Sequence, residues 1–179
     1  MPKEIRQRTT EQIIRSAFRD LVREGHKNIN VKKICDAAAI SRATFYAHYR
    51  DLYDLIATDE REALSRLGFE DYAENYTDPK ARAGIFLRVL THLDENEWLY
   101  RYYFGVQGNW YFSLVLQDIM AAVSAELVRR GVFSEQEKAD LSVLYHTTGL
   151  MAALRRWLEY GRAKPCTREA YAQMLSEIA

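Results

Sequence analysis

The sequence predicts an all-α protein, and three observations lead to this fold class. Apolar residues recur every three to four positions over long stretches. Only three prolines and eight glycines interrupt the 179 residues. Hydrophobic residues make up 48% of the chain, which is enough to build a core. We therefore expect one medium helical domain, or a small one joined to a larger one.

Composition and motifs also exclude several other classes. No apolar run approaches the roughly 18 residues of a membrane span, and the N-terminus lacks the apolar stretch of a signal peptide. The two cysteines, Cys35 and Cys166, are too few for a four-thiolate zinc site or a disulfide framework. We expect a cytoplasmic protein without a membrane contact, metal or cofactor. Cys166 could still be a redox-sensing thiol beside Lys164 and Arg168, although a lone thiol is usually inert.

Enzyme signatures are missing from the sequence. It contains no glycine-rich phosphate loop, no Gly-x-Ser-x-Gly and no His-Glu-x-x-His. The four histidines are scattered, and the paired Glu-x-x-His motifs of a helical di-iron site do not occur. We therefore expect a protein that is not an enzyme and has no catalytic residues.

Residues 1–50 predict three helices. The first covers residues 9–24, has an apolar stripe and ends at Gly25. Asn30 can cap a short helix over residues 31–38, and Ser41 can cap another over residues 42–49. Two short helices with a tight turn at Ala39 and Ile40 have helix-turn-helix spacing. Neither is long enough to be stable alone, so both must pack against the first helix.

The second short helix has a face that fits DNA. Phe45 and Tyr49 are four positions apart, so they share one side of the helix. Burying that side turns four other residues outward: Arg42, Ala43, Tyr46 and Ala47. Arginine commonly reads guanine, alanine can contact a thymine methyl group, and tyrosine can donate to phosphate. The alternative is a surface helix with ordinary exposed residues.

The charge distribution is also consistent with DNA binding, but it does not separate this interpretation from the alternative. Residues 1–50 contain eleven Lys or Arg and five Asp or Glu, a net charge of +6, whereas the whole chain is neutral. A basic N-terminal segment suits a polyanionic partner, although such a bias can also arise by chance.

The sequence over residues 9–56 resembles the N-terminal signature of the tetracycline-repressor (TetR) family. The resemblance is carried by Ser-x-x-Thr-Phe-Tyr-x-His-Tyr at residues 41–49, preceded by Ala38-Ala39-Ile40. Two departures are Ala39, where the family commonly has glycine, and Arg50-Asp51-Leu52, where many members have a lysine. The resemblance implies a regulator that binds a palindromic operator in double-stranded DNA as a homodimer. The residues expected at DNA are Lys32, Ser41, Arg42, Ala43, Thr44, Tyr46, Ala47, His48 and Arg50.

Residues 51–179 predict a larger helical domain for effector binding and dimerisation, after a DNA-binding domain of residues 1–50. Its first helix is capped by Asp51 and continues toward Tyr72, and a second follows Asp78-Pro79. A third covers residues 111–130. A capping box at residues 134–137 is expected to open a long helix that ends at Gly161, and the last helix spans residues 167–178.

Residues 98–112 contain eight aromatic side chains, interrupted by glycines, so the two halves of this cluster are expected on different helices. Large aromatics often simply fill a core, but they also line pockets for small apolar or aromatic ligands. In the TetR family such an effector commonly releases the operator. Candidate effector residues are Trp98, Tyr102, Tyr103, Trp110, Tyr145 and His146. A lone histidine such as His146 is more often a hydrogen-bonded core residue.

The last two predicted helices resemble the pair through which TetR-type proteins dimerise. Small residues at 147, 149, 152 and 153 would allow close helix approach. Candidate interface residues are Val143, Leu150, Leu154, Leu158, Tyr171 and Leu175. The sequence thus predicts a dimeric repressor that is released by a small effector. The alternative is a TetR-like co-activator or interaction protein whose C-terminal domain binds a protein.

Overall fold

The computed structural model describes residues 3–104, 110–161 and 163–178, without the side chains of residues 3–8, 69–70 and 110–115. These residues form helices, turns and loops, and no strand occurs among them. The predicted all-α fold class is therefore confirmed. None of the described helices combines the length and the hydropathy that a membrane span requires.

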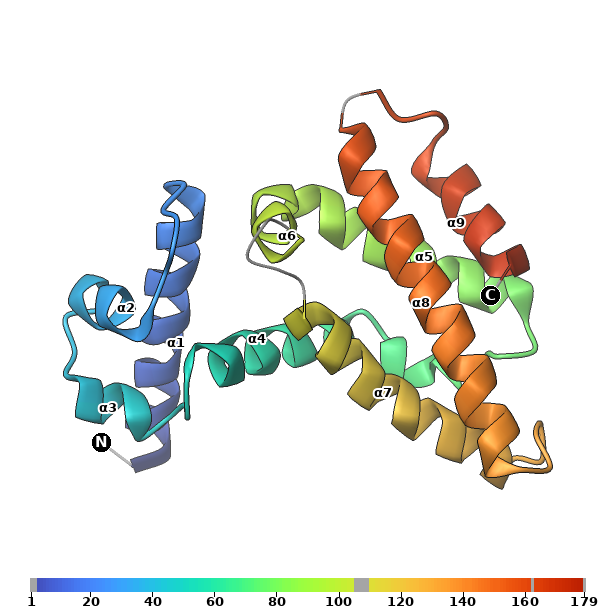
Figure 1. Cartoon of the computed structure of the whole chain (residues 1–179), viewed down its shortest axis with the longest axis horizontal. Helices are drawn as coiled ribbons and strands as arrows, with labels where there is room; N and C mark the ends of the chain where they lie inside the picture. Colours follow the sequence, from blue (N-terminus) through green and yellow to red (C-terminus); the bar gives the residue numbers. More distant parts are fainter. Residues whose placement is uncertain (1–2, 105–109, 162, 179) are drawn as a thin grey trace. The chain divides into compact units, whose positions relative to one another are not determined.

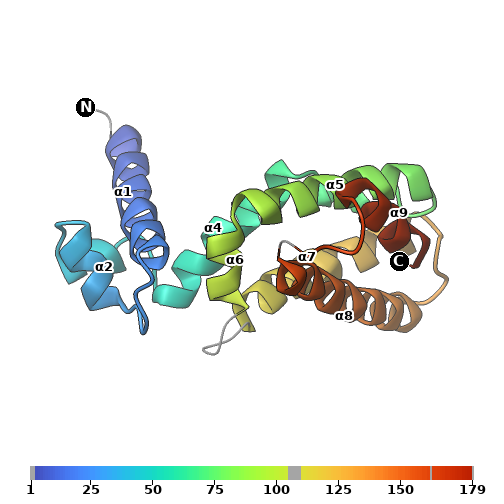
Figure 2. The same cartoon turned by 90° about the horizontal axis from the view of Figure 1, so that it is seen from above.

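Figures 1 and 2 show the helices in chain order. They are α1 (Lys3–Arg23), α2 (Val31–Ala37), α3 (Arg42–Tyr46), α4 (Leu52–Arg66), the 3₁₀ helix η1 (Phe69–Tyr72), α5 (Pro79–Glu95), α6 (Glu97–Tyr103), α7 (Trp110–Arg129), α8 (Gln136–Tyr160) and α9 (Arg168–Ile178).

Several helix boundaries differ from the sequence prediction. Helix α1 begins at Lys3, six residues before the predicted start at Thr9. Helix α4 ends at Arg66, because Gly68 takes a left-handed conformation with φ of 73° and a 3₁₀ turn follows. The predicted capping box at residues 134–137 is wrong. Glu135 is the N-cap of α8, and its side chain makes no capping hydrogen bond.

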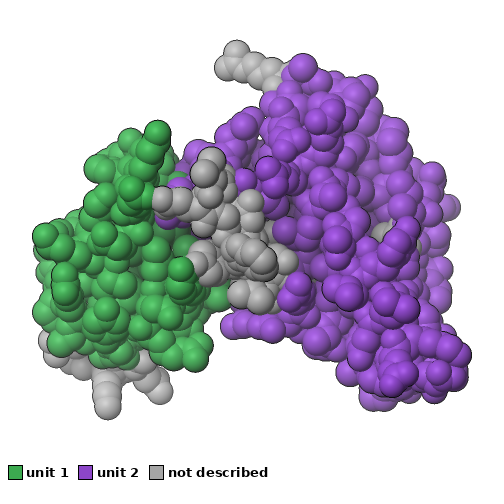
Figure 3. Space-filling model, viewed as in Figure 1, with its two compact units in different colours: residues 1–59 green, residues 60–179 purple. Residues whose placement is uncertain are grey.

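The chain divides into two compact units, residues 1–59 and 60–179 (Figure 3). The boundary lies within α4, which contributes residues to both units. The assignment of DNA binding to residues 1–50 and of regulation to residues 51–179 stays a prediction.

Unit 1 is built around α1. Helices α1 and α2 pack together, and α2 packs against α3. The core contains fully buried side chains from four helices: Ile14, Phe18, Ile34, Phe45 and Leu55. This packing holds α2 and α3, whose seven and five residues are too few for independent helices.

Unit 2 contains two close helix pairs, α5 with α9 and α7 with α8 (Figures 1 and 2). Asp78 caps α5 by accepting hydrogen bonds from the Lys80 and Ala81 amides, and Pro79 occupies the first turn. Trp157 of α8 is completely buried, and its indole N–H donates to Asp94 of α5 at 2.9 Å. The aromatic cluster of residues 98–112 is divided between α6 and α7, as predicted.

Candidate nucleic-acid interface and regulatory sites

The turn between α2 and α3 has the predicted geometry of a helix-turn-helix. Asn30 caps α2 by accepting from the Lys33 amide, and Ser41 caps α3 by accepting from the Thr44 amide, both at 3.0 Å. Ala39 has a φ of 52°, in the left-handed region that favours glycine. The Ile40 amide donates to the Cys35 carbonyl at 3.0 Å and closes the turn. The sequence therefore positions α3 through two caps and one strained residue.

Helix α3 separates a buried side from an exposed side. Phe45 is fully buried and its ring contacts that of Tyr49, with centroids 5.7 Å apart. The predicted base-reading residues are all exposed, and Tyr46 keeps 56% of its surface accessible. They are Arg42, Ala43, Tyr46 and Ala47. The helix ends at Tyr46, earlier than predicted, because the chain turns so that Tyr49 enters the core.

The flanking candidates differ in exposure and in their hydrogen-bond partners. Lys32 and Ser41 are exposed, whereas Thr44 is half-buried with its hydroxyl 2.9 Å from that of Ser41. The Nδ1 atom of His48 lies 3.4 Å from a Glu11 oxygen, and His48 is half-buried. The exposed Arg50 guanidinium lies 3.4 Å from the Asp54 carboxylate, and its pKa is raised by this hydrogen bond and charge. A phosphate contact from His48 or Arg50 must therefore compete with a carboxylate.

Two polar contacts attach α1 to the rest of unit 1. Arg15 donates to the Tyr49 hydroxyl at 3.1 Å. Burial raises the pKa of Tyr49, although the Arg15 hydrogen bond acts in the opposite direction. Arg19 donates through Nε and Nη2 to one oxygen of Asp59, at 3.1 and 2.8 Å. These contacts fix the two ends of the segment from Tyr49 to Asp59, which follows α3 and contains the first half of α4.

The predicted effector residues do not form one group in the structure. Trp98, Tyr102 and Tyr103 lie on α6, with Tyr103 buried and the other two half-buried. The side chain of Trp110 lies outside the described residues. Tyr145 and His146 lie on α8, about 18 Å along the helix axis from Leu158. The Leu158 carbonyl accepts a hydrogen bond from Arg101 of α6, so Leu158 marks the part of α8 that contacts α6. Tyr145 and His146 belong instead to a groove on α8 and α9.

That groove is apolar and has a volume of about 620 Å³. Tyr145 and Leu141 are exposed on α8, at 74% and 69%, and Ile178 is exposed on α9, at 75%. The predicted interface residues lie mostly beneath this surface. Val143, Leu150, Leu154, Leu158 and Leu175 are buried, and half-buried Tyr171 donates to the Ala153 carbonyl at 3.0 Å. These residues pack within the chain, and their place in a dimer interface stays a prediction.

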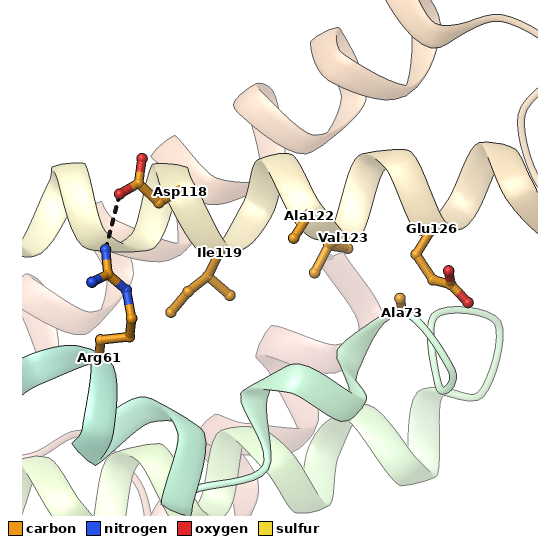
Figure 4. Close-up of a pocket in the computed structure, with 7 residues that line it drawn as sticks. All are labelled: Arg61, Ala73, Asp118, Ile119, Ala122, Val123 and Glu126. Atoms are coloured by element: carbon orange, nitrogen blue, oxygen red, sulfur yellow. Dashed lines mark hydrogen bonds and ion pairs between the residues drawn. The ribbon is translucent and has the colours of Figure 1, made fainter.

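A second groove, of about 350 Å³, lies between α4, the segment after η1 and α7 (Figure 4). An ion pair between Arg61 and Asp118, with atoms 3.1 Å apart, closes one end, while Ile119 and Val123 line the middle. Glu126 lies at the other end, and its pKa is lowered to about 2 because Arg129 and Arg130 donate to it. No local sequence pattern indicates this groove, because its ion pair joins residues 57 positions apart.

Sequence reasoning also missed two buried carboxylates on α4, Asp59 and Glu60. The Tyr100 hydroxyl donates to Glu60 at 3.1 Å, inside unit 2. A signal was available, because both acids fall on the apolar stripe that contains Leu55, Ile56 and Leu64. No group of three or more metal-ligating side chains is found in the described part of the chain.

The fold and the exposed side of α3 define a class: all-helical proteins in which an N-terminal helix-turn-helix is followed by a larger helical unit. Comparison with known proteins agrees with this class. Over 146 residues the chain is 29% identical to the dhaKLM operon transcriptional activator DhaS of Lactococcus lactis, and the match covers 79% of this chain and 68% of DhaS. No family model matches the chain.

Solved structures of helical transcriptional regulators share the fold. A dihydroxyacetone kinase operon activator, DhaS, superposes with a TM-score of 0.56 at 19% identity, covering 94% of this chain and 93% of that one. The fatty acid degradation regulator FadR from Bacillus halodurans gives 0.58 at 15% identity, with the same coverage. RolR in complex with resorcinol gives 0.60 at 19% identity, covering 99% and 90%.

Proposed function

We propose that this protein is a sequence-specific, DNA-binding transcriptional regulator of the TetR type that acts in the cytoplasm. The observation that carries this proposal is that α3 has one buried side and one exposed side. Phe45 is buried, while Arg42, Ala43, Tyr46 and Ala47 are exposed together on a helix held by a helix-turn-helix. Small methyl groups beside one guanidinium and one phenol let a helix approach base edges closely and read them. Lys32, Ser41, Thr44, His48 and Arg50 supply the surrounding phosphate contacts in this proposal.

The protein acts as a homodimer in this proposal, and the occupant of the α8–α9 groove is a second copy of the chain. Leu141, Leu144 and Ile178 expose apolar surface on adjoining helices, and Gly149 and Ala152 allow a facing helix to come near. A helix-turn-helix dimer places its two recognition helices about 34–36 Å apart, one turn of DNA. The DNA sequence that matches such a dimer is a palindromic operator.

We further propose that the protein is a repressor and that a small apolar or aromatic effector regulates it. Binding of this effector releases the protein from DNA. The aromatic residues of α6 offer a surface of the kind that binds such molecules. RolR, which shares the fold, was solved with resorcinol. We place the effector beside Trp98, Tyr102 and Tyr103.

A second candidate function is that of a co-activator whose unit 2 binds another protein. Two observations favour it. DhaS, 29% identical to this chain, is named a transcriptional activator. The apolar α8–α9 groove is also large enough to receive a helix of a partner protein.

The test of DNA binding is a selection from random DNA duplexes, followed by titration of the enriched sequence at several salt concentrations. We expect a palindromic sequence to be enriched and its affinity to fall linearly with salt on a logarithmic scale, as phosphate contacts release counterions. Absence of any enriched sequence would contradict the proposal. Sedimentation of the free protein and its DNA complex distinguishes a homodimer from a monomer that waits for a protein partner.

A further inference from the structure

Two side chains of α1 hold the segment that follows α3. Glu11 and Arg15 are four positions apart, so they share one face of α1. A Glu11 oxygen lies 3.4 Å from Nδ1 of His48, and Arg15 donates to the Tyr49 hydroxyl at 3.1 Å. The backbone amides of His48 and Tyr49 both donate to the Phe45 carbonyl at 2.9 Å. The turn after α3 thus fixes the His48 backbone, while Glu11 of α1 orients its ring.

The pair of Glu11 and His48 lies at the edge of the unit 1 core. The Glu11 side chain is 31% exposed and the His48 side chain 11%, so the pair is partly shielded from solvent. The other charged side chains of this region have different contacts: Arg15 with the Tyr49 hydroxyl, Arg50 with the Asp54 carboxylate and Asp51 with the Asp54 amide. Glu11 therefore supplies the negative charge next to the ring.

The chemistry of imidazole restricts what His48 can bind beside Glu11. A neutral ring carries one N–H donor, and its other nitrogen is an acceptor. A carboxylate only accepts, so the neutral ring bonds Glu11 through Nδ1–H and leaves Nε2 as an acceptor. Phosphate oxygens are acceptors as well. His48 can therefore donate to Glu11 and to a DNA phosphate together only as an imidazolium, with a proton on each nitrogen.

We propose that Glu11 is a positioning residue for DNA binding: it holds Nδ1 of His48 so that Nε2 donates to a DNA phosphate, and this contact takes up one proton from solvent per chain. The inference rests on the proposed function, in which His48 contacts phosphate. Competition between Glu11 and phosphate is resolved because the two acceptors use different nitrogens. Histidine changes its charge between pH 5 and 8, so DNA binding weakens as pH rises through this range.

The first test measures binding of the full chain to its selected duplex at pH 6 and pH 8 and at constant salt. We expect wild-type affinity to fall about tenfold or more over this interval, because His48 must regain a proton to bind. His48→Gln carries a neutral donor, so its affinity should change less than about twofold. His26→Gln is the matched control, since it removes an exposed histidine paired with Glu24 at 3.2 Å, and it should keep the wild-type pH dependence.

Two results would overturn the proton-linked contact. One is a wild-type affinity that stays constant between pH 6 and pH 8. The other is a pH dependence in His48→Gln equal to that of the wild type.

The second test examines Glu11 in the free protein by NMR of the imidazole nitrogens, which distinguishes the two neutral tautomers. We expect the Nδ1–H form of His48 in the wild type and in Glu11→Gln, which keeps an oxygen acceptor, but a mixture of both forms in Glu11→Ala. An unchanged tautomer in Glu11→Ala would overturn the role of Glu11. If wild-type protein selects no DNA sequence, the proposed function and the phosphate contact fail together, while the NMR result still decides whether Glu11 positions His48.

Discussion

Ala39 holds a backbone conformation that glycine adopts at lower cost. Its φ of 52° lies in the left-handed region, where a Cβ atom meets the following carbonyl oxygen. Ala39→Gly is therefore expected to stabilise unit 1 by about 1 kcal/mol. Ala37→Gly is the matched control, because Ala37 is also exposed but belongs to α2, where glycine costs up to about 1 kcal/mol.

Urea denaturation of the two variants measures this difference. Opposite signs for Ala39→Gly and Ala37→Gly support strain in the turn. A loss of stability in both would mean that the left-handed conformation at position 39 costs less than the added freedom of glycine in the unfolded chain.

Arg42 is the exposed cation on the outward side of α3. If its guanidinium reads a base with two hydrogen bonds, Arg42→Ala should weaken operator binding by about 1–3 kcal/mol and relax preference at one base-pair position. The control is Arg155→Ala on α8, which removes an exposed arginine of unit 2. Binding to a panel of single-base operator variants measures both effects. Uniform weakening across the panel would assign Arg42 to phosphate instead.

At the scale of helices, the proposed dimer depends on side chains that are exposed in the α8–α9 groove. Leu144 is 53% exposed in this groove, so replacing it with glutamate should leave the protomer folded and place a charge in the dimer interface. We expect Leu144→Glu to shift sedimentation at micromolar concentration from dimer to monomer. Val132→Glu changes an exposed apolar residue outside the groove and should have no effect. A dimer that persists in Leu144→Glu would contradict this interface.

The sequence predicted most of the helices, but not which of their apolar residues pack within the chain and which stay exposed. Caps at Asn30 and Ser41, and the spacing of Phe45 from Tyr49, are local signals, and the structure contains the helices they predict. Helix α8 is apolar on more than one side. Periodicity alone therefore could not separate Leu154, which packs within unit 2, from Leu141, which stays exposed. The groove beside Arg61 depends on contacts between residues distant in sequence, and no local pattern encodes them.

For the whole molecule, effector control can be tested by its reciprocity. Small apolar and aromatic compounds, resorcinol included, are screened by thermal stabilisation, and each hit is titrated with and without operator. A true effector must lose affinity in the presence of operator by the same factor by which it weakens operator binding. We expect a factor of 5–150, the usual range of such couplings. A compound with equal affinity in both titrations shifts no equilibrium and would favour the co-activator function.

The exposed side of α3 also has an evolutionary consequence. Packing in unit 1 uses Phe45 and Tyr49, while the outward residues of α3 add nothing to the core. Substitutions of Arg42, Ala43 and Tyr46 are therefore expected to cost little stability, since exposed positions away from caps usually change it by less than about 0.5 kcal/mol. If α3 reads DNA as proposed, duplicated copies of the gene can diverge toward new target sequences while the core of unit 1 is kept.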